Sequence, residues 1–351
     1  MFDMLALNHE DTVELLDMET VIGMVETAYK LKDTEDAALW PMIFHEFEQG
    51  VADMDIKSGH LEGAGIYGLK LVSWFGPNAE KNLPQLVGTV MVFDGETGAP
   101  KAILSAEHIT CMRTGAAGAI GSKYLARPDS KTLLMVGTGH QAAFQIAATL
   151  MVMPSVEKVL IYNAIDEEQA KSFTATIADR LKTEFLAHFP NNTEKHALYS
   201  KKFDVTFEAV TNIESQTSEA DIIITATPSR KAIILKDWVK PGTHFSCVGA
   251  DMEGKQEIDA ELFGMGRVFT DDITQSTNVG EAETAVKAGI IKADDIVSEI
   301  GAVLNGSVKG RTSDEEITIY DSTGIALQDL ITADYAIKVA KEKGIGTAFK
   351  L

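Results

Sequence analysis

The run Gly137-Thr138-Gly139-His140-Gln141-Ala142 constrains the fold more than any other part of the sequence. It follows the apolar segment 132–136, which is typical of a buried strand, and precedes a helix-forming segment. In such a turn the first glycine permits the tight bend, the second lets the backbone approach a pyrophosphate, and a small third residue lets the helix pack closely. The free N–H groups at the helix N-terminus favour an anion. The run therefore predicts a dinucleotide site, with a glycine turn in an unliganded α/β domain as the alternative.

Strand-like and helix-like segments alternate through the region 131–321. The expected strands are the apolar stretches at 132–137, 158–163, 204–210, 221–227, 243–249 and 267–271. This alternation predicts right-handed βαβ units and a parallel, doubly wound α/β sheet. We interpret the polar segment 187–203 as a surface excursion between a helix and a strand.

The remainder of the chain predicts a second, α+β domain. Apolar segments at 66–75 and 86–94, followed by a glycine-rich turn, indicate antiparallel hairpins. A helix rich in glycine and alanine follows at 105–126, and another is expected at 325–342, returning to the first domain. We therefore expect a discontinuous substrate-binding and dimerisation domain, residues 1–125 with 322–351, and a Rossmann-type domain, residues 126–321.

Charge and cysteine content exclude several classes of protein. A net charge of −21 and a pI of about 4.7 argue against binding to nucleic acid or to anionic membranes. No apolar run is long enough for a membrane span, and the N-terminus lacks the features of a signal peptide. The 2 cysteines suit a reducing compartment and have no metal-site spacing, so we expect a cytoplasmic protein without a bound metal.

The second expected strand of the nucleotide domain bears on the choice of cofactor. Enzymes that use NAD often place Asp or Glu about 20 residues beyond the glycine motif, at the adenosine ribose. Here the strand ends at Asn163, 26 residues after Gly137, with Asp166 close by and no arginine in the next residues. These residues favour NAD over NADP and leave both open.

Three charged residues are candidates for binding and converting a substrate. Lys70 lies within the apolar strand 66–75, where a lysine loses hydration unless it has a partner or a ligand. Arg113 is surrounded by small residues, as a bidentate carboxylate site requires. Asp251 follows an expected parallel strand, at the edge where such sheets form ligand sites. The structural alternatives are an edge-strand lysine, a helix-surface arginine and a loop aspartate.

Six blocks, in this order, resemble the ornithine cyclodeaminase/mu-crystallin family: GLKLVS, MRTGAAGAIGSKYLA, VGTGHQAAFQ, DIIITAT, VGADMEGKQEID and DSTGIALQDL. The resemblance covers nearly the whole chain and implies a homodimer with a nicotinamide cofactor. It also implies that Lys70 and Arg113 hold the substrate carboxylate and that Asp251 moves a proton at the substrate nitrogen. Thr227 and Ser322 would lie near the nicotinamide.

The sequence departs from that family at one substrate contact. Many members have an arginine shortly after a proline as a third carboxylate contact, whereas here Pro41 is followed by Met-Ile-Phe-His45. His45 or Lys57 could substitute, or Lys57 could be a solvated lysine in an acidic segment. Lys57 with its nearby glycine, and the GHQAAFQ and GKQEID stretches, resemble the branch that includes iminosuccinate reductase.

Together these features predict an NAD- or NADP-dependent reductase or dehydrogenase of a small anionic 2-imino or 2-amino acid. Hydride would pass between the nicotinamide and the substrate α-carbon. One alternative is a cyclodeaminase of the ornithine type, in which NAD is reduced and reoxidised within a turnover. Another is a non-catalytic nucleotide- or ligand-binding protein, as in mu-crystallin. The substrate side chain is not specified by these motifs.

Overall fold

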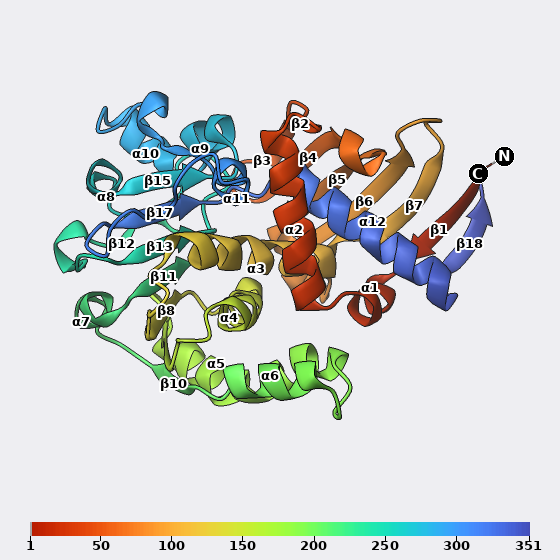
Figure 1. Ribbon diagram of the computed structural model, residues 1–351. Coiled ribbons are helices and arrows are strands. Elements are labelled where there is room, and N and C mark those ends of the chain that lie inside the picture. Colours follow the sequence, from red (N-terminus) through yellow and green to blue (C-terminus); the bar gives the residue numbers. More distant parts are fainter. Residues whose placement is uncertain (1) are drawn as a thin grey trace. The chain divides into compact units, whose positions relative to one another are not determined.

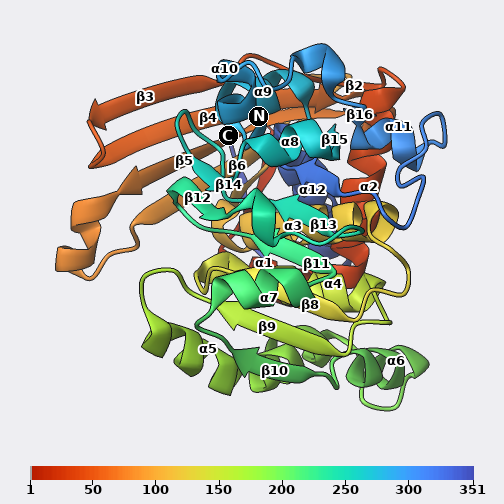
Figure 2. The same ribbon diagram turned by 90° about the vertical axis from the view of Figure 1, so that its left-hand side faces the viewer.

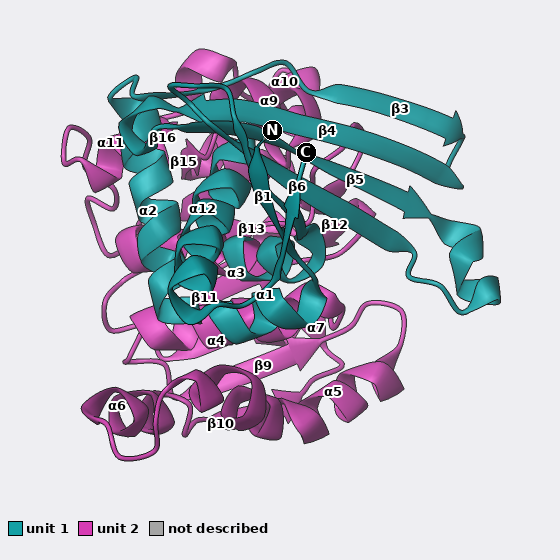
Figure 3. Ribbon diagram, turned by 90° about the vertical axis from the view of Figure 1, so that its right-hand side faces the viewer, with its two compact units in different colours: residues 1–113, 325–351 teal, residues 114–324 magenta. Residues whose placement is uncertain are grey.

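The computed structural model describes residues 2–351, which form two compact units (Figure 3). Unit 1 extends to Arg113 and resumes from Ile325 to Leu351, and unit 2 comprises Thr114–Gly324. The chain therefore leaves the first unit, builds the second and returns, so that unit 1 is discontinuous. No helix among residues 2–351 has the length and apolar character needed to cross a bilayer.

Unit 1 is built on an eight-stranded sheet in the order β18-β1-β7-β6-β5-β4-β2, with β3 also pairing with β4. The strands are β1 (Asp3–Leu7), β2 (Ala37–Leu39), β3 (Ile43–Glu48), β4 (Ala52–Leu61), β5 (Ile66–Phe75), β6 (Leu86–Asp94), β7 (Pro100–Ser105) and β18 (Thr347–Lys350). The predicted antiparallel hairpins are present between β5 and β6 and between β6 and β7. The pair β1–β7 is parallel, which the hairpin pattern did not predict.

Helices α1 (His9–Leu15), α2 (Met18–Asp33) and α12 (Ala326–Lys343) complete unit 1. The apolar residues Val21, Ile22, Val25, Ala28 and Tyr29 recur at helical spacing and form the buried stripe of α2. Helix α12 packs against α2 and against β4, β5 and β6 (Figure 1). It approaches the sheet closely, because a Cβ added at Gly68 would lie 2.7 Å from a methyl carbon of Leu330. Strand glycines therefore let this helix lie on the sheet.

Helix α3 (Ala106–Leu125) contains the boundary between the units, after Arg113. Its second half packs within unit 2 through glycines: a Cβ at Gly115 would lie 2.8 Å from the Phe144 carbonyl oxygen, and one at Gly121 would lie 2.4 Å from the Tyr320 ring. This close packing explains why unit 2 starts at residue 114 and not at the end of the helix. The expected boundaries at 125 and 322 therefore differ from the observed ones at 113 and 324.

Unit 2 has an eight-stranded parallel sheet in the order β10-β9-β8-β11-β13-β17-β15-β16 (Figure 2). Its strands are β8 (Thr132–Val136), β9 (Lys158–Tyr162), β10 (Thr206–Ala209), β11 (Ile222–Thr225), β13 (His244–Cys247), β15 (Arg267–Thr270), β16 (Ser298–Glu299) and β17 (Thr318–Asp321). Its α-helices are α4 (His140–Val152), α5 (Glu167–Arg180), α6 (Glu194–Lys202), α7 (Ile213–Glu219), α8 (Glu261–Met265), α9 (Ile273–Val279), α10 (Ala282–Lys287) and α11 (Ile300–Leu304). The predicted doubly wound, Rossmann-like sheet is confirmed.

The polar segment 187–203 is more ordered than the surface excursion expected for it. Helix α6 forms within it, with the Thr193 side chain accepting a hydrogen bond from the His196 N–H at the helix start. Tyr199 is buried and its ring lies 4.9 Å from that of Phe189. The segment thus keeps a polar exterior and adds a small apolar contact. Strands β12 (Arg230–Ile234) and β14 (Gln256–Ile258) pair in parallel as a separate two-stranded sheet.

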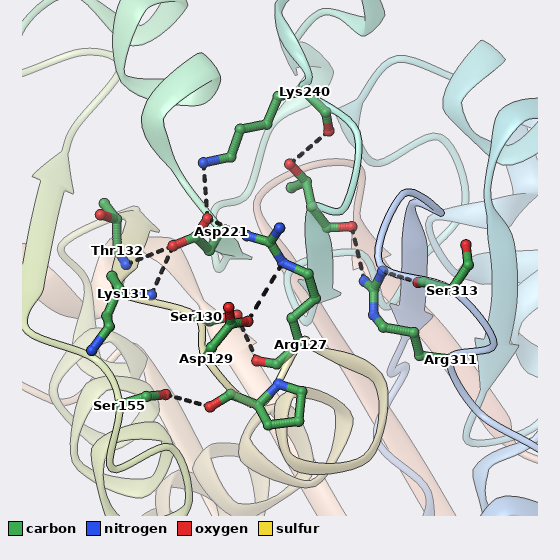
Figure 4. Close-up of polar contacts among 12 residues, drawn as sticks. Arg127, Asp129, Ser130, Lys131, Thr132, Ser155, Asp221, Lys240, Arg311 and Ser313 are labelled. Carbon is green, nitrogen blue, oxygen red and sulfur yellow. Dashed lines mark hydrogen bonds and ion pairs between the residues drawn. The ribbon is translucent and has the colours of Figure 1, made fainter.

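An ion-pair cluster lies at the N-terminal ends of the strands of the eight-stranded sheet of unit 2 (Figure 4). Asp221 accepts hydrogen bonds from the backbone N–H groups of Lys131 and Thr132, at 2.7 and 3.1 Å, and pairs with Arg127 and Lys240, each at 2.8 Å. Burial alone would raise the pKa of Asp221, but these donors lower it. Asp221 therefore joins the starts of β8 and β11 and leaves the opposite edge for ligand binding.

Candidate functional site

The glycine turn between β8 and α4 has the geometry that a pyrophosphate requires. Gly137 has a φ of +110°, and an added Cβ would lie 2.6 Å from the Ala226 carbonyl oxygen, so only glycine fits. Gly139 is the N-cap of α4, no side chain caps this helix, and a Cβ at Gly139 would meet nothing within 4 Å. The N–H groups of the helix thus face open space, which fits the phosphates of a dinucleotide.

A pocket of about 290 Å³ opens beside this turn. It is lined by Gly137, Thr138, Gly139, Asn163, Ala164, Ile165, Gln169, Ala226, Thr227, Pro228, Ser229 and Ile233. The predicted residues Gly137, Thr138, Gly139, Asn163 and Thr227 therefore surround one cavity. The motif residues His140 and Gln141 form the first turn of α4 and are not part of the lining.

Asn163 is held in place at the end of β9. Its side-chain amide donates to Thr138 Oγ1 at 2.7 Å and to Gln169 Oε1 at 2.6 Å. Its carbonyl oxygen accepts from the backbone N–H groups of Ile165 and Asp166, each at 3.0 Å. The loop after β9 is thereby fixed around a neutral amide, and no lysine or arginine lines the pocket among the described residues.

Unit 1 brings together three of the predicted cations. Lys57 on β4 and Lys70 on β5 lie directly opposite each other in the antiparallel pair, and they are only 8% and 3% exposed. Arg113, in the first half of α3, is 6% exposed. Asp329 on α12, fully buried, accepts hydrogen bonds at 3.1 Å from both Lys70 Nζ and Arg113 Nε. We call Lys57, Lys70 and Arg113 the buried cation cluster, and Asp329 is the carboxylate that contacts two of its members.

The charges in this cluster set the protonation state of Lys70. Burial, together with the nearby Arg113 guanidinium, lowers the pKa of Lys70 to about 8, against the smaller opposing effect of Asp329. Burial alone would raise the pKa of Asp329, but the charges of Arg113 and Lys70 lower it, so this residue is ionised at neutral pH. A second carboxylate near Lys70 and Arg113 would meet a positive site that excludes most water.

Gln328 and Tyr29 orient the arginine. Gln328 Oε1 accepts from Arg113 Nη1 at 3.0 Å, and its amide nitrogen donates to the Tyr29 hydroxyl. Asp329 and Gln328 thus engage Nε and Nη1 of Arg113 and fix the plane of its guanidinium, which has five N–H donors in all. Asp329, Gln328 and Tyr29 were not among the site residues predicted from the sequence. The one available signal was the pair of polar residues Gln328-Asp329 within an otherwise apolar helical segment.

Other predicted residues lie outside the cation cluster and the pocket. His45 on β3 pairs in register with Met54, which alternation places on the face opposite Lys57, and its side chain is exposed and contacts Phe47. The structure thus brings Lys57, and not His45, to Lys70. Asp251 lies on the loop after β13, half exposed, and forms an ion pair with Lys255 at 2.5 Å. Ser322, buried after β17, donates to Asp271 Oδ2 at 3.1 Å.

Comparison with known proteins identifies relatives over the full length. The sequence model of the ornithine cyclodeaminase/mu-crystallin family matches residues 3–189 and 185–344. The iminosuccinate reductase of Paracoccus denitrificans is 33% identical over 342 residues, which are 97% of this chain and 98% of the relative.

Two solved structures superpose closely. An archaeal alanine dehydrogenase, a dimer with bound NAD, has a TM-score of 0.87 and 34% identity and covers 100% of both chains. The Δ1-pyrroline-2-carboxylate reductase of Thermococcus litoralis, in complex with NADH and L-proline, has a TM-score of 0.87 and 30% identity, covering 98% of this chain and 99% of that one.

Proposed function

The chain belongs to the ornithine cyclodeaminase/mu-crystallin family, and we propose that it is a nicotinamide-dependent reductase or dehydrogenase of a small 2-imino or 2-amino acid. Three of the relatives that resemble it over nearly its full length are named for iminosuccinate, alanine and Δ1-pyrroline-2-carboxylate. These compounds share a carboxylate next to a carbon that carries nitrogen. The common chemistry is hydride transfer at that carbon.

The buried cation cluster is the observation that carries this proposal. Lys57, Lys70 and Arg113 are concentrated in one place in a protein whose net charge is −21. Asp329 and Asp55 are the carboxylates that act on Lys70 from nearby. Three cations against two carboxylates leave one positive charge, and an anionic substrate would balance it. Burying a charged side chain costs free energy, and charged groups that are buried in this way occur often at ligand-binding sites.

Each residue has a distinct role in the proposed reaction. Arg113 and Lys70 hold the substrate carboxylate, with Lys57 as the third cation, and thereby orient the α-carbon. Asp251, on an exposed loop, exchanges a proton with the substrate nitrogen. The nicotinamide supplies or accepts the hydride when it is bound. Orientation accounts for a large share of the acceleration available to such a reaction.

We propose NAD in preference to NADP as the cofactor. The pocket lining has no basic side chain that could pair with a 2′-phosphate, and Asp166 follows Asn163 at the loop that would face the ribose. Two of the solved relatives are bound to NAD or NADH. A direct comparison of the two nucleotides by nicotinamide fluorescence tests the preference. Replacing Gly139 by leucine should abolish binding of both, because the side chain would occupy the phosphate position.

A substrate panel tests the reaction itself. Wild-type protein is incubated with NADH and 2-oxo acids in the presence of ammonia or methylamine, with cyclic imino acids, and with ornithine and lysine. We expect net NADH oxidation with one of the imino acids. Formation of a cyclic amino acid from ornithine or lysine without net change in NADH would instead identify a cyclodeaminase, and nucleotide binding without any turnover would identify a binding protein.

The carboxylate site has its own test. Arg113→Met should lower kcat/KM for the acid by the equivalent of about 2–5 kcal/mol, as expected when one partner of a buried charge pair is lost. The dissociation constant of NADH should barely change, because the nucleotide pocket is lined by other residues. A wild-type kcat/KM in a folded Arg113→Met protein would remove the cation cluster from the active site.

A further inference from the structure

Glu257 on β14 is a fully buried carboxylate that accepts four hydrogen bonds. Its Oε1 accepts from the backbone N–H of Thr227 at 2.6 Å and from the Thr227 hydroxyl at 2.7 Å. Its Oε2 accepts from the Thr225 hydroxyl at 2.7 Å and from the backbone N–H of Gly249 at 3.0 Å. One side chain thus joins two segments of unit 2.

These two segments are the ones that the proposed reaction uses. Thr225 ends β11, and Thr227 follows it in the wall of the nucleotide pocket. Gly249 follows β13 and is two residues before Asp251. Because β11 and β13 are parallel neighbours, both segments leave the same edge of the sheet. Glu257 itself does not line the pocket, so any effect on the nucleotide passes through these segments.

The hydrogen bonds to Glu257 favour its ionised form, against the burial that raises its pKa. Each oxygen faces one backbone N–H, which can only donate, and one threonine hydroxyl, and four such contacts stabilise the charged form. The neighbouring Glu281 is fully buried, and burial followed by the charge of Glu257 raises its pKa well above the ordinary value. Its Oε1 accepts from the backbone N–H groups of Glu257 and Ile258, each at 2.7 Å. Glu281 is therefore the neutral partner, and it supports β14 without repelling the charge.

We propose that Glu257 is a positioning residue that fixes Thr227 in the wall of the nucleotide pocket and Gly249 at the start of the loop carrying Asp251. The inference rests on the proposed function, because it assigns these two segments to cofactor and proton transfer. A second hydrogen bond, from the Ser229 N–H to the Thr227 hydroxyl at 3.3 Å, extends the effect along the pocket wall. Glu257 thereby fixes the positions of two segments that are otherwise separate.

The principal test is Glu257→Gln, which preserves shape and removes the charge. The amide NH2 must face one of the two backbone N–H groups, of Thr227 or of Gly249, so at least one of the two segments loses its backbone hydrogen bond. We expect the dissociation constant of NADH to rise about 10- to 100-fold, the range for hydrogen bonds to a charged acceptor, and kcat to fall. The matched control is Thr225→Val, which removes one hydrogen bond to the same carboxylate from a residue outside the pocket. It should lower Tm but leave NADH affinity within about threefold.

A double-mutant cycle with Thr227→Val separates positioning from general stability. If Glu257 acts through Thr227, the double variant should bind NADH only slightly more weakly than Glu257→Gln alone, and Thr227→Ser should restore affinity. Additive losses, or a Glu257→Gln protein with lower Tm and unchanged NADH affinity and kcat, would overturn the proposal. Should Glu257→Gln not fold, equal NADH affinity in Thr227→Val and Thr227→Ser would overturn it instead. Absence of NADH binding by the wild type would refute the proposed function and not this linkage alone.

Discussion

The charge of Lys70, in the cation cluster, depends on pH close to neutrality. Its pKa is lowered to about 8 by burial and by Arg113, so the ammonium form that a carboxylate needs is lost as the pH rises through that value. We expect the inhibition constant of a substrate-like 2-oxo acid, measured without ammonia, to rise about tenfold per pH unit above pH 8. Steady-state inhibition between pH 6.5 and about 9.5 measures this.

Lys70→Arg provides the comparison, because a guanidinium keeps its charge over this range. The rise in the inhibition constant should disappear in that variant even if its affinity is lower throughout. A wild-type inhibition constant that stays constant up to about pH 9.5 would show that Lys70 does not contact the carboxylate.

Asp329 has the opposite role, since it balances the cations when no substrate is bound. Asp329→Asn should lower the free energy of unfolding by about 3–5 kcal/mol, because Lys70 and Arg113 would then be buried together without a negative partner. A small carboxylate ligand should raise the Tm of this variant more than that of the wild type. Thermal unfolding with increasing 2-oxo acid measures both effects.

Asp334→Asn is the matched control on the same helix. Asp334 pairs with Lys101 at 2.5 Å, but both side chains are partly exposed, at 29% and 25%. Exposed pairs contribute about 0–1 kcal/mol, so this change should have little effect on Tm and none on its ligand dependence. Equal losses in the two variants would contradict the role given to Asp329.

At the level of elements, the sequence predicted those helices and strands whose hydrophobic pattern and turn residues fit one type of structure. The strand–turn–helix around Gly137 and the hairpins around Lys70 were predicted because alternation and turn residues are local signals. Strands β1 and β18 and helix α6 were missed, because they are short or polar and their pairing depends on distant segments. The same limit applies to the site: Asp329 meets Lys70 across 259 residues of sequence, and Glu257 meets Thr227 by a fold-dependent contact.

Glycines in two helices provide a prediction at this scale. Gly121→Ala should lower the free energy of unfolding by about 1–3 kcal/mol, because the added Cβ would lie 2.4 Å from the Tyr320 ring and 2.9 Å from Ser246 Oγ. Gly23→Ala in α2 should raise it by about 0.5–1 kcal/mol, because nothing lies within 4 Å of the added Cβ and alanine favours the helix. Chemical denaturation measures the opposite signs, and a loss in both variants would contradict close packing as the cause.

At the scale of the whole molecule, exposed apolar side chains of unit 1 support the homodimer that the sequence resemblance implies. The exposed apolar side chains on or beside β3, β5 and β6 lie on both faces of the sheet and are Ile43, Phe44, Phe47, Leu71, Phe75, Leu83, Leu86 and Val87, all at least 36% exposed. Figure 3 shows β3, β4 and β5 extending side by side beyond the helices of unit 1. Monomers rarely leave so many apolar groups in water, and one of the solved relatives is a dimer.

The prediction is that Phe47→Glu shifts the protein towards the monomer. Phe47 is 56% exposed and its ring lies 5.5 Å from that of Phe75, so a charge there would be buried in the interface. Met265→Glu, at a residue of unit 2 that is 57% exposed, should leave the assembly unchanged. Light scattering at micromolar concentration distinguishes the two, and a wild-type monomer under those conditions would refute the dimer.

Several buried carboxyl groups in unit 2 make the free energy of unfolding depend on pH. Burial is the largest cause that raises the pKa of Asp321 to about 7, and it also raises the pKa values of Asp271, Glu257 and Glu281. A carboxyl whose pKa is raised on folding binds protons more tightly in the folded state, so the free energy of unfolding falls as the pH rises from about 4 to 7. Asp221 has the opposite sign, because its pKa is lowered and its contribution is present above about pH 4.

We therefore expect the Tm of the wild type to be higher near pH 5.5 than near pH 8. Asp321→Asn should reduce this difference, because the amide does not titrate while its oxygen can still accept the hydrogen bond from the Ala282 N–H that Asp321 accepts at 3.0 Å. Asp221→Asn should lower Tm at both pH values and keep the difference, since its own titration lies below this range. Calorimetry at constant protein concentration measures all three proteins, which keeps any dimer contribution equal. A Tm that rises from pH 5.5 to 8 in the wild type would mean that these carboxyl groups are ionised at little cost in the folded protein.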